Sequence, residues 1–294
     1  MTPLPINFER HEGLLDRRLL SCTRIAVVGV GGAAGLVKDL ARLGVGTLHL
    51  VDFDYVSNTN PATQSFGAHQ HGEWKVEALA DDLARINPEV RVVAHGRHVE
   101  ALTAREWEMI ARFDLILAMT DSPAAQLLLN RFALQTGIDT LFAAAYPGAS
   151  ATEITGTFSD SPAGCHLCLA WPRYEALAGG HRREKRIPSH VFQASFLNAQ
   201  LGLLVISLLH HRAGSALGNP GLAERFLRSP LIVTRLDTER FPTEFGETAR
   251  DQNLFACKQF GPQRPAFVHC PHCGARPPAL TPGDQERDHN QGAL

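Results

Sequence analysis

The chain has 294 residues, 44% of them hydrophobic and 20% charged, and its formal net charge is −2. This composition fits one large or two small globular domains, and the near-neutral charge argues against a general nucleic-acid binder. No run approaches the ~20 apolar residues of a membrane span, and the N-terminus lacks the apolar core of a signal peptide. We therefore expect a cytoplasmic protein with no membrane partner, whose six cysteines are thiols or metal ligands.

The first half of the chain alternates between apolar runs and helical patterns. Residues 1–23 are expected to form a helical arm. Strands are predicted at 24–28, 47–51, 90–94, 114–119 and 140–145, and helices at 33–43, 75–86, 101–111 and 124–135. Because these strands are apolar on both faces, residues 24–150 are predicted to form a Rossmann-like α/β unit, with a mostly parallel sheet flanked by helices.

The regular alternation of strand and helix patterns ends near residue 150, and residues 151–276 are expected to form an antiparallel C-terminal extension. Its predicted parts are a half-exposed antiparallel strand at 152–158, an exposed basic loop at 172–190, a long helix at 191–211 and a last strand at 231–238, followed by irregular chain from Pro242. The polar, proline-containing tail, residues 277–294, is expected to be disordered.

A glycine cluster follows the first predicted strand. Gly29, Gly31 and Gly32 lie between that strand and a helix, and Asp52 ends the next strand. Glycines let backbone N–H groups approach a phosphate, the helix N-terminus favours an anion, and the carboxylate can accept ribose hydroxyls. The pattern predicts a nucleotide site.

Further polar residues follow the predicted strands at the same edge of the sheet. Asp54, Asn58, Asn60 and Gln64 form a polar loop after the second strand. Lys75 begins a helix, a position that favours anions and is suited to a lysine when phosphate binds; a solvated surface lysine is the commoner alternative.

The carboxylate of Asp121 follows another strand, where it could hold Mg²⁺ or cap the next helix.

Two CxxC pairs occur in the second half. Cys165 and Cys168 form one pair, Cys270 and Cys273 the other, and 101 residues separate them. Four thiolates suit tetrahedral structural zinc, which leaves no open position for catalysis, whereas unrelated pairs or a redox CxxC are the alternatives. The neighbouring histidines at 166, 269 and 272 are not needed as ligands.

Together these blocks resemble the ThiF/MoeB/ubiquitin-activating-enzyme superfamily. The resemblance rests on RIAVVGVGGAAG, LHLVDFDYVSNTN, the lysine of GEWKVEAL, ARINP, TDS, CHLC and HCPHC, across residues 7–274. Members bind ATP·Mg, adenylate the C-terminal glycine carboxylate of a ubiquitin-like or sulfur-carrier protein, and usually form homodimers. The resemblance thus implies an adenylyltransferase with ATP, Mg²⁺ and structural zinc, and a conjugating enzyme or sulfurtransferase as a possible further partner.

The resemblance also implies roles for single residues. Catalysis would involve Arg10, reaching the partner subunit's phosphate site, together with Lys75 and Asp121, the last also positioning Mg²⁺. Zinc would be bound by Cys165, Cys168, Cys270 and Cys273. ATP would be bound by Gly29, Gly31, Gly32, Asp52, Asp54, Asn60, Gln64, Lys75 and Ser122.

Two departures from the family pattern stand out. Thr63 occupies the place of the arginine in the family's N-x-x-R-Q motif, and a hydroxyl cannot provide arginine's charged, bidentate grip on phosphate. Arg17, Arg18 and the basic run 182–186 are candidate replacements. The crossover loop, residues 172–190, contains no cysteine, which leaves Cys257 and Cys22 as the thiols outside the zinc pairs.

Three alternatives remain open. Thr63 is compatible with a catalytically impaired scaffold subunit that keeps the fold and the partner surface. The glycine loop alone would fit an NAD-dependent oxidoreductase, and ATP-dependent activation of a small carboxylate would fit a tRNA-modifying dehydratase.

Overall fold

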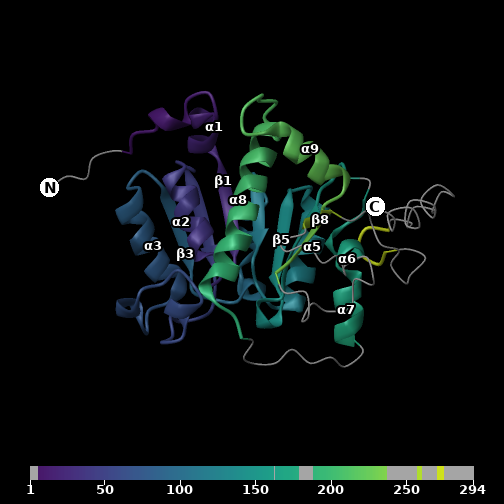
Figure 1. Ribbon diagram of the computed structural model, residues 1–294, viewed down its shortest axis with the longest axis horizontal. Helices are drawn as coiled ribbons and strands as arrows, with labels where there is room; N and C mark the ends of the chain where they lie inside the picture. Colours follow the sequence, from purple (N-terminus) through teal and green to yellow (C-terminus); the bar gives the residue numbers. More distant parts are fainter. Residues whose placement is uncertain (1–5, 162, 179–187, 237–256, 260–269, 275–294) are drawn as a thin grey trace, which may run out of the picture.

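A computed structural model describes residues 6–161, 163–178, 188–236, 257–259 and 270–274 (Figure 1). In these residues eight strands form one sheet in the order β3-β2-β1-β4-β5-β6-β7-β8. Strands β1 to β5 pair in parallel, and β6, β7 and β8 continue the sheet in antiparallel pairing. The strands are β1 Arg24–Val28, β2 Thr47–Val51, β3 Arg91–His95, β4 Leu115–Ala118, β5 Thr140–Ala145, β6 Ala151–Thr157, β7 Leu231–Arg235 and β8 Cys257–Gln259.

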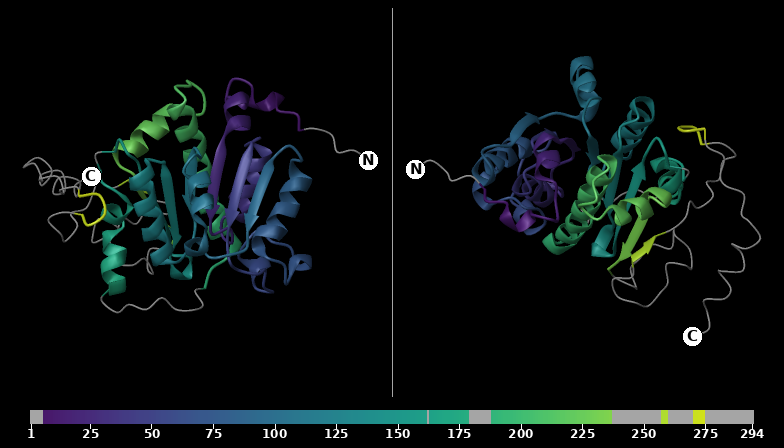
Figure 2. Two further views of the ribbon diagram at one scale, coloured as in Figure 1. Left: turned by 180° about the vertical axis from the view of Figure 1, so that it is seen from behind. Right: turned by 90° about the horizontal axis from the view of Figure 1, so that it is seen from above.

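Helices cover both faces of the sheet (Figure 2). The α-helices are α1 Arg17–Cys22, α2 Ala34–Arg42, α3 Lys75–Ile86, α4 Ala104–Ile110, α5 Pro123–Thr136, α6 His166–Leu169, α7 Trp171–Ala178, α8 Val191–Arg212 and α9 Pro220–Arg228. Short 3₁₀ turns lie at η1 Glu9–His11, η2 Asn60–Ala62, η3 Ala68–Gln70, η4 Val99–Ala101 and η5 Pro147–Ala149.

The alternating side chains of β1 show how the two layers of core arise. Ile25 and Val27 pack with residues of α2, α3, α8 and α9, whereas Ala26 and Val28 pack with residues of α4 and α5. Because both faces are covered, β1, β4 and β5 are buried along almost their whole length and consist mainly of apolar residues, as the sequence pattern predicted. The predicted α/β class, the flanking helices and the antiparallel extension are confirmed.

Several predicted bounds are wrong for local reasons. The helix predicted at 101–111 begins at Ala104, because Thr103 caps it: Thr103 Oγ1 accepts from the Glu106 N–H at 3.3 Å, and Glu106 Oε2 accepts from the Thr103 N–H at 2.7 Å. Helix α9 was not predicted; it follows Asn219 and begins with Pro220, a combination typical of a helix start. Strand β8 lies in the segment that was predicted to be irregular.

The C-terminal extension is more buried than predicted. Strand β6 is buried at every position, not half-exposed, because α8 packs on one face and α5 and α6 lie against it as well. Residues 172–178, the start of the predicted exposed loop, lie in α7, in which Arg173 and Tyr174 are buried. Residues 179–187 of that loop, which include the basic run 182–186, and the tail 277–294 lie outside the described residues, whereas residues 188–190 are exposed.

Helix α8 is long and apolar enough to cross a membrane by length and composition alone. In this fold it packs along the sheet, where it contacts α2, α9, β5 and β6. Buried core helices have the same composition, and this packing explains its apolar character.

The N-terminal arm lies at the end of the sheet where β1 begins (Figure 1). It contains η1 and α1, and it contacts the end of α8 through the Asp16 N–H, which donates to His210 Nε2 at 2.8 Å. The arm therefore lies at the amino ends of the parallel strands, whereas the glycine cluster lies at their carboxyl ends.

Candidate functional site

A cavity of about 330 Å³ lies at the carboxyl ends of the parallel strands. It lies beside β1 and β4, where the strand order reverses, which is the usual ligand position in open α/β sheets. Nine residues predicted to bind the nucleotide or its metal line it: Gly29, Gly31, Gly32, Asp52, Asp54, Gln64, Lys75, Asp121 and Ser122.

Two glycines of the loop after β1, Gly29 and Gly32, have different local roles. Gly29 has a φ of +85°, and a Cβ there would lie 2.7 Å from the backbone nitrogen of Thr120, so packing alone requires glycine. A Cβ at Gly32 would meet nothing within 4 Å, because this glycine borders the open cavity. Asn198 of α8 fixes the loop by donating from Nδ2 to the Gly32 carbonyl at 2.9 Å.

The loop leads into a helix end without a side-chain cap. Ala33 precedes α2 and makes no capping hydrogen bond. The first N–H groups of a helix have no intrahelical acceptors and attract anions. This end of α2 therefore suits the phosphates of a nucleotide.

Asp52 lies at the end of β2 with 8% of its surface exposed. Its carboxylate accepts hydrogen bonds from the Val30 N–H at 2.8 Å and the Asp54 N–H at 2.9 Å. Burial raises the pKa of Asp52, while these N–H groups and the nearby Lys75 act in the opposite direction. The carboxylate is held rigidly between the glycine loop and the polar loop.

Lys75 is the first residue of α3 and is buried, with 5% exposure. Its Nζ lies 2.9 Å from Asp54 Oδ2. The alternative of a solvated surface lysine is therefore wrong. A buried ammonium at the cavity wall is suited to bind a ligand anion, in competition with Asp54.

Thr63 and Gln64 form an uncharged part of the cavity wall. Gln64 Oε1 is buried and has no hydrogen-bond partner among the described residues, which favours a ligand donor at this position. Thr63 also lines the cavity, and its hydroxyl lies 3.4 Å from the Thr59 and Asn60 carbonyl oxygens. The structure thus places a neutral side chain where the resemblance predicts arginine.

Arg97 is a cavity-lining cation that the sequence reasoning missed. It lies just after β3, and its Nη1 is 3.7 Å from Glu106 Oε1. Its place after the carboxyl end of a parallel strand was the available signal. The proposed replacements Arg17 and Arg18 lie in α1, at the opposite edge of the sheet.

Two predicted site residues do not line the cavity. Asn60 lies in η2, where its Oδ1 accepts from the Ser57 N–H at 2.7 Å. Arg10 is exposed in η1, in the N-terminal arm. Their roles in phosphate binding remain predictions.

The segment after β4 separates the two roles that were considered for Asp121. Ser122 caps α5, accepting from the Ala125 N–H at 3.3 Å, so the cap does not depend on Asp121. Asp121 is exposed at the cavity wall. A carboxylate oxygen there is a suitable Mg²⁺ ligand when a nucleotide is bound.

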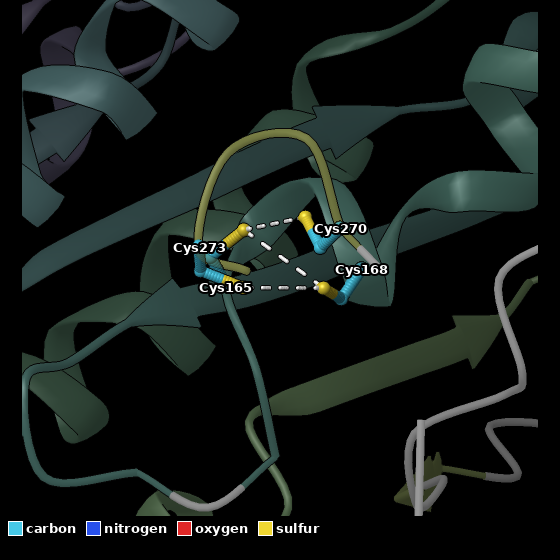
Figure 3. Close-up of side chains that lie close together, drawn as sticks. All are labelled: Cys165, Cys168, Cys270 and Cys273. Atoms are coloured by element: carbon cyan, nitrogen blue, oxygen red, sulfur yellow. Dashed lines mark hydrogen bonds between the residues drawn. The ribbon is translucent and has the colours of Figure 1, made fainter. Parts of the chain in front are cut away.

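The two cysteine pairs are far apart in sequence but lie close together in the structure (Figure 3). Sulfur–sulfur distances are 4.0 Å for Cys165–Cys168, 3.8 Å for Cys165–Cys270 and 3.6 Å for Cys168–Cys273. Tetrahedral zinc with bonds of ~2.3 Å requires sulfur separations of about 3.8 Å, so the cluster has the right size. A cluster of four candidate metal ligands, tying residues 270–273 to α6, is confirmed.

The close approach of the four thiols alters their acidity. Hydrogen bonds from Cys165 and Cys168 lower the pKa of Cys270 to about 6, whereas hydrogen bonding with Cys165 and the other thiols raises the pKa of Cys168. A divalent cation would favour deprotonation of all four thiols. Of the other thiols, Cys22 is exposed and Cys257 lies in β8.

The sequence is similar to that of known proteins. The sequence profile of the ThiF family matches residues 6–227. Molybdopterin-synthase adenylyltransferase of Escherichia coli (strain K12) is 38% identical over 128 residues, which are 42% of this chain and 47% of that protein. Adenylyltransferase and sulfurtransferase uba4 of Aspergillus niger is 33% identical over 127 residues, which are 42% of this chain and 26% of that protein.

Solved structures show the same fold. The crystal structure of E. coli MccB with MccA-N7isoASN has a TM-score of 0.63 at 15% identity, covering 88% of this chain and 69% of that one. PaaA has a TM-score of 0.59 at 17% identity, with 77% and 73% covered. At these identities the likeness concerns the fold alone, and the match to the curated relatives above spans about half of their length or less.

Proposed function

Because the chain belongs to the ThiF family, we propose that it is an adenylyltransferase acting on the C-terminal glycine carboxylate of a small ubiquitin-like or sulfur-carrier protein. A carboxylate oxygen would attack the α-phosphorus of ATP, and the bond to the leaving pyrophosphate would break, giving an acyl-adenylate. The observation that carries the proposal is the convergence of the glycine loop, Asp52, Gln64, Lys75 and Asp121 on one cavity.

Each cavity residue would have a role that follows from its chemistry. Asp52 would accept the ribose hydroxyls, and the N-terminus of α2 beside Gly32 would bind phosphate oxygens. Lys75 would contribute positive charge where two anions, carboxylate and phosphate, must meet. Asp121 would hold Mg²⁺, which neutralises phosphate charge when bound.

The second half of the chain would serve the partner protein. We propose that zinc in the cysteine cluster is structural, because four protein ligands complete its coordination. A cytoplasmic homodimer, with Arg10 reaching the partner subunit's phosphates, is part of the same proposal. The final acceptor of the activated carboxylate would be a conjugating enzyme or a sulfurtransferase.

The test is pyrophosphate–ATP exchange with a β-grasp carrier protein that ends in glycine. Exchange is expected with the intact carrier and expected to vanish when the terminal glycine is removed or amidated. Absence of exchange with the intact carrier, while ATP·Mg still binds, contradicts catalysis.

A second candidate is a non-catalytic scaffold, favoured by the neutral Thr63 at the cavity wall. Calorimetry separates the two readings. A scaffold would bind the carrier without binding ATP·Mg, whereas the proposed enzyme binds both. NAD(H) serves as the control ligand, and a change in NADH fluorescence on adding the protein would favour an oxidoreductase instead.

A further inference from the structure

Helix α5 carries two polar residues on its buried face. Gln126 and Asn130, four residues apart, are both 0% exposed. Residues four apart lie on one side of a helix, and a buried amide is costly unless it is hydrogen-bonded. Since α5 begins next to Asp121, the partners of these amides show what this helix connects.

Gln126 joins the Asp121 loop to α7. Its Nε2 donates to the carbonyl of Thr120 at 2.8 Å, one residue before Asp121. Its Oε1 accepts from Arg173 Nη1 at 2.9 Å and from the Tyr174 hydroxyl at 3.2 Å. One side chain thus fixes the backbone that presents Asp121 and is itself fixed by two residues of α7.

Arg173 is fixed in turn by a buried ion pair. Its Nη2 lies 3.2 Å from Glu153 Oε1 in β6, and the two side chains are 6% and 2% exposed. The Tyr146 hydroxyl donates to Glu153 Oε2 at 2.7 Å, and Tyr146 also lines the cavity. Buried ion pairs are weak evidence for stability, but their geometry is strict, because breaking one leaves an uncompensated charge.

The same network reaches the cysteine cluster. Asn130 Nδ2 donates to Cys165 Sγ at 3.3 Å, and Asn130 Oδ1 accepts from the Thr157 hydroxyl at 2.6 Å. His166, which lies between Cys165 and Cys168 in sequence, is 2.8 Å from the Tyr174 hydroxyl through its Nε2. Two residues one turn apart on α5 are therefore connected to the cavity and to the cysteines.

We propose that Gln126 is a positioning residue for Asp121, and that through Gln126 the α7 residues Arg173 and Tyr174 couple the geometry of the cysteine cluster to the cavity. This inference rests on the proposed function, because it assigns Asp121 to a nucleotide-bound divalent cation. Gln126 itself touches neither nucleotide nor cation.

The test compares Gln126→Met, which keeps the side-chain length and loses the hydrogen bonds, with Ser207→Ala. Ser207 is a similarly buried polar residue whose hydroxyl donates to the Leu203 carbonyl at 2.8 Å. It lies in α8, whose apolar residues belong to a different core layer from those of α5. The readout is the affinity of the protein·ATP complex for Mn²⁺, measured by electron paramagnetic resonance on the full chain. Gln126→Met should weaken Mn²⁺ binding roughly tenfold, while Ser207→Ala should leave it unchanged at a similar loss of melting temperature.

A milder variant keeps the inference testable if Gln126→Met does not fold. Tyr174→Phe removes one of the two donors to Gln126 Oε1 and keeps the ring, so Mn²⁺ binding should weaken about two- to threefold. Mn²⁺ affinity that matches Ser207→Ala in every folded variant overturns the inference. If wild-type protein binds ATP and Mn²⁺ but supports no pyrophosphate exchange, the proposed function fails while this measurement still decides the role of Gln126.

Discussion

Thr63 is the residue at which the chain departs most clearly from the family pattern. It lines the cavity, and its hydroxyl offers no positive charge to a phosphate. Restoring the charge with Thr63→Arg should strengthen ATP binding at least about tenfold, since a charge-assisted hydrogen bond is worth about 1.5–3 kcal/mol. Calorimetry with ATP·Mg measures the change, with Thr63→Val as the uncharged control. An unchanged affinity would mean that Arg97 or a partner residue already supplies the charge.

His49 is a buried residue with an expected effect on acid stability. It is 0% exposed in β2 and its ring stacks on that of His95, with centroids 4.5 Å apart. Burial, followed by the neighbouring His95, lowers the pKa of His49 to about 4. The unfolded chain, with a histidine pKa near 6.5, binds the extra proton first as pH falls.

The stabilising effect of neutral His49 is therefore complete above pH 6.5 and is lost as pH falls toward 4. The loss is roughly 3 kcal/mol at most. Urea unfolding between pH 7 and 4 measures it. His49→Leu should flatten this pH dependence, and the control His71→Gln, at an exposed position, should retain it. Equal pH profiles for His49→Leu and the wild type would show that other groups govern acid unfolding.

Single residues also show where sequence reasoning reached its limit. Gly29, Asp52 and Asp121 were predictable because each follows a strand of a parallel sheet, and such strand ends meet at one edge. Arg97 follows β3 in the same way but lies in a loop that resembles any exposed surface segment. Gln126 and Arg173 were unpredictable, since their hydrogen bonds join elements 47 residues apart in sequence.

At the scale of elements, the α/β half could be predicted well and the extension less so. Runs of apolar residues identified β1, β2 and β5 with their observed bounds. Strand β6 alternates in sequence, yet polar Thr152, Glu153 and Thr155 are buried, because helices cover it and its polar groups are paired. The segment that contains α7 is rich in charge and was therefore predicted to be exposed. It is partly buried because its arginine forms an ion pair with a buried carboxylate.

The cysteine cluster is expected to hold the C-terminal segment against α6. One zinc per chain should be found by mass spectrometry of the native protein, and Cys270→Ser should lose it. Loss of the metal should lower the melting temperature, because zinc binding contributes to folding. Cys22→Ser, an exposed thiol outside the cluster, is the control and should retain the metal. Metal retained in Cys270→Ser would contradict the four-thiolate site.

At the scale of the whole molecule, the position of Arg10 requires a second copy if this residue is to act in catalysis. It lies in the N-terminal arm, at the edge of the sheet opposite the cavity of its own chain. Mixing Arg10→Ala and Lys75→Ala subunits should restore about a quarter of the wild-type sites, since random pairing gives one intact site in each mixed dimer. Pyrophosphate–ATP exchange measures the recovery. Either variant alone should be nearly inactive, and no recovery on mixing would argue against a contribution in trans.

If the protein is an adenylyltransferase, its cavity joins AMP to a carrier's terminal carboxylate. The most direct measurement is the intact mass of a glycine-terminated β-grasp carrier after incubation with the protein, ATP and Mg²⁺, under acidic conditions that preserve acyl-adenylates. We expect a species heavier by one AMP less water, absent with the Lys75→Ala protein and converted back to free carrier by added pyrophosphate. A carrier whose mass stays unchanged, although it binds the protein and ATP is bound, would contradict it.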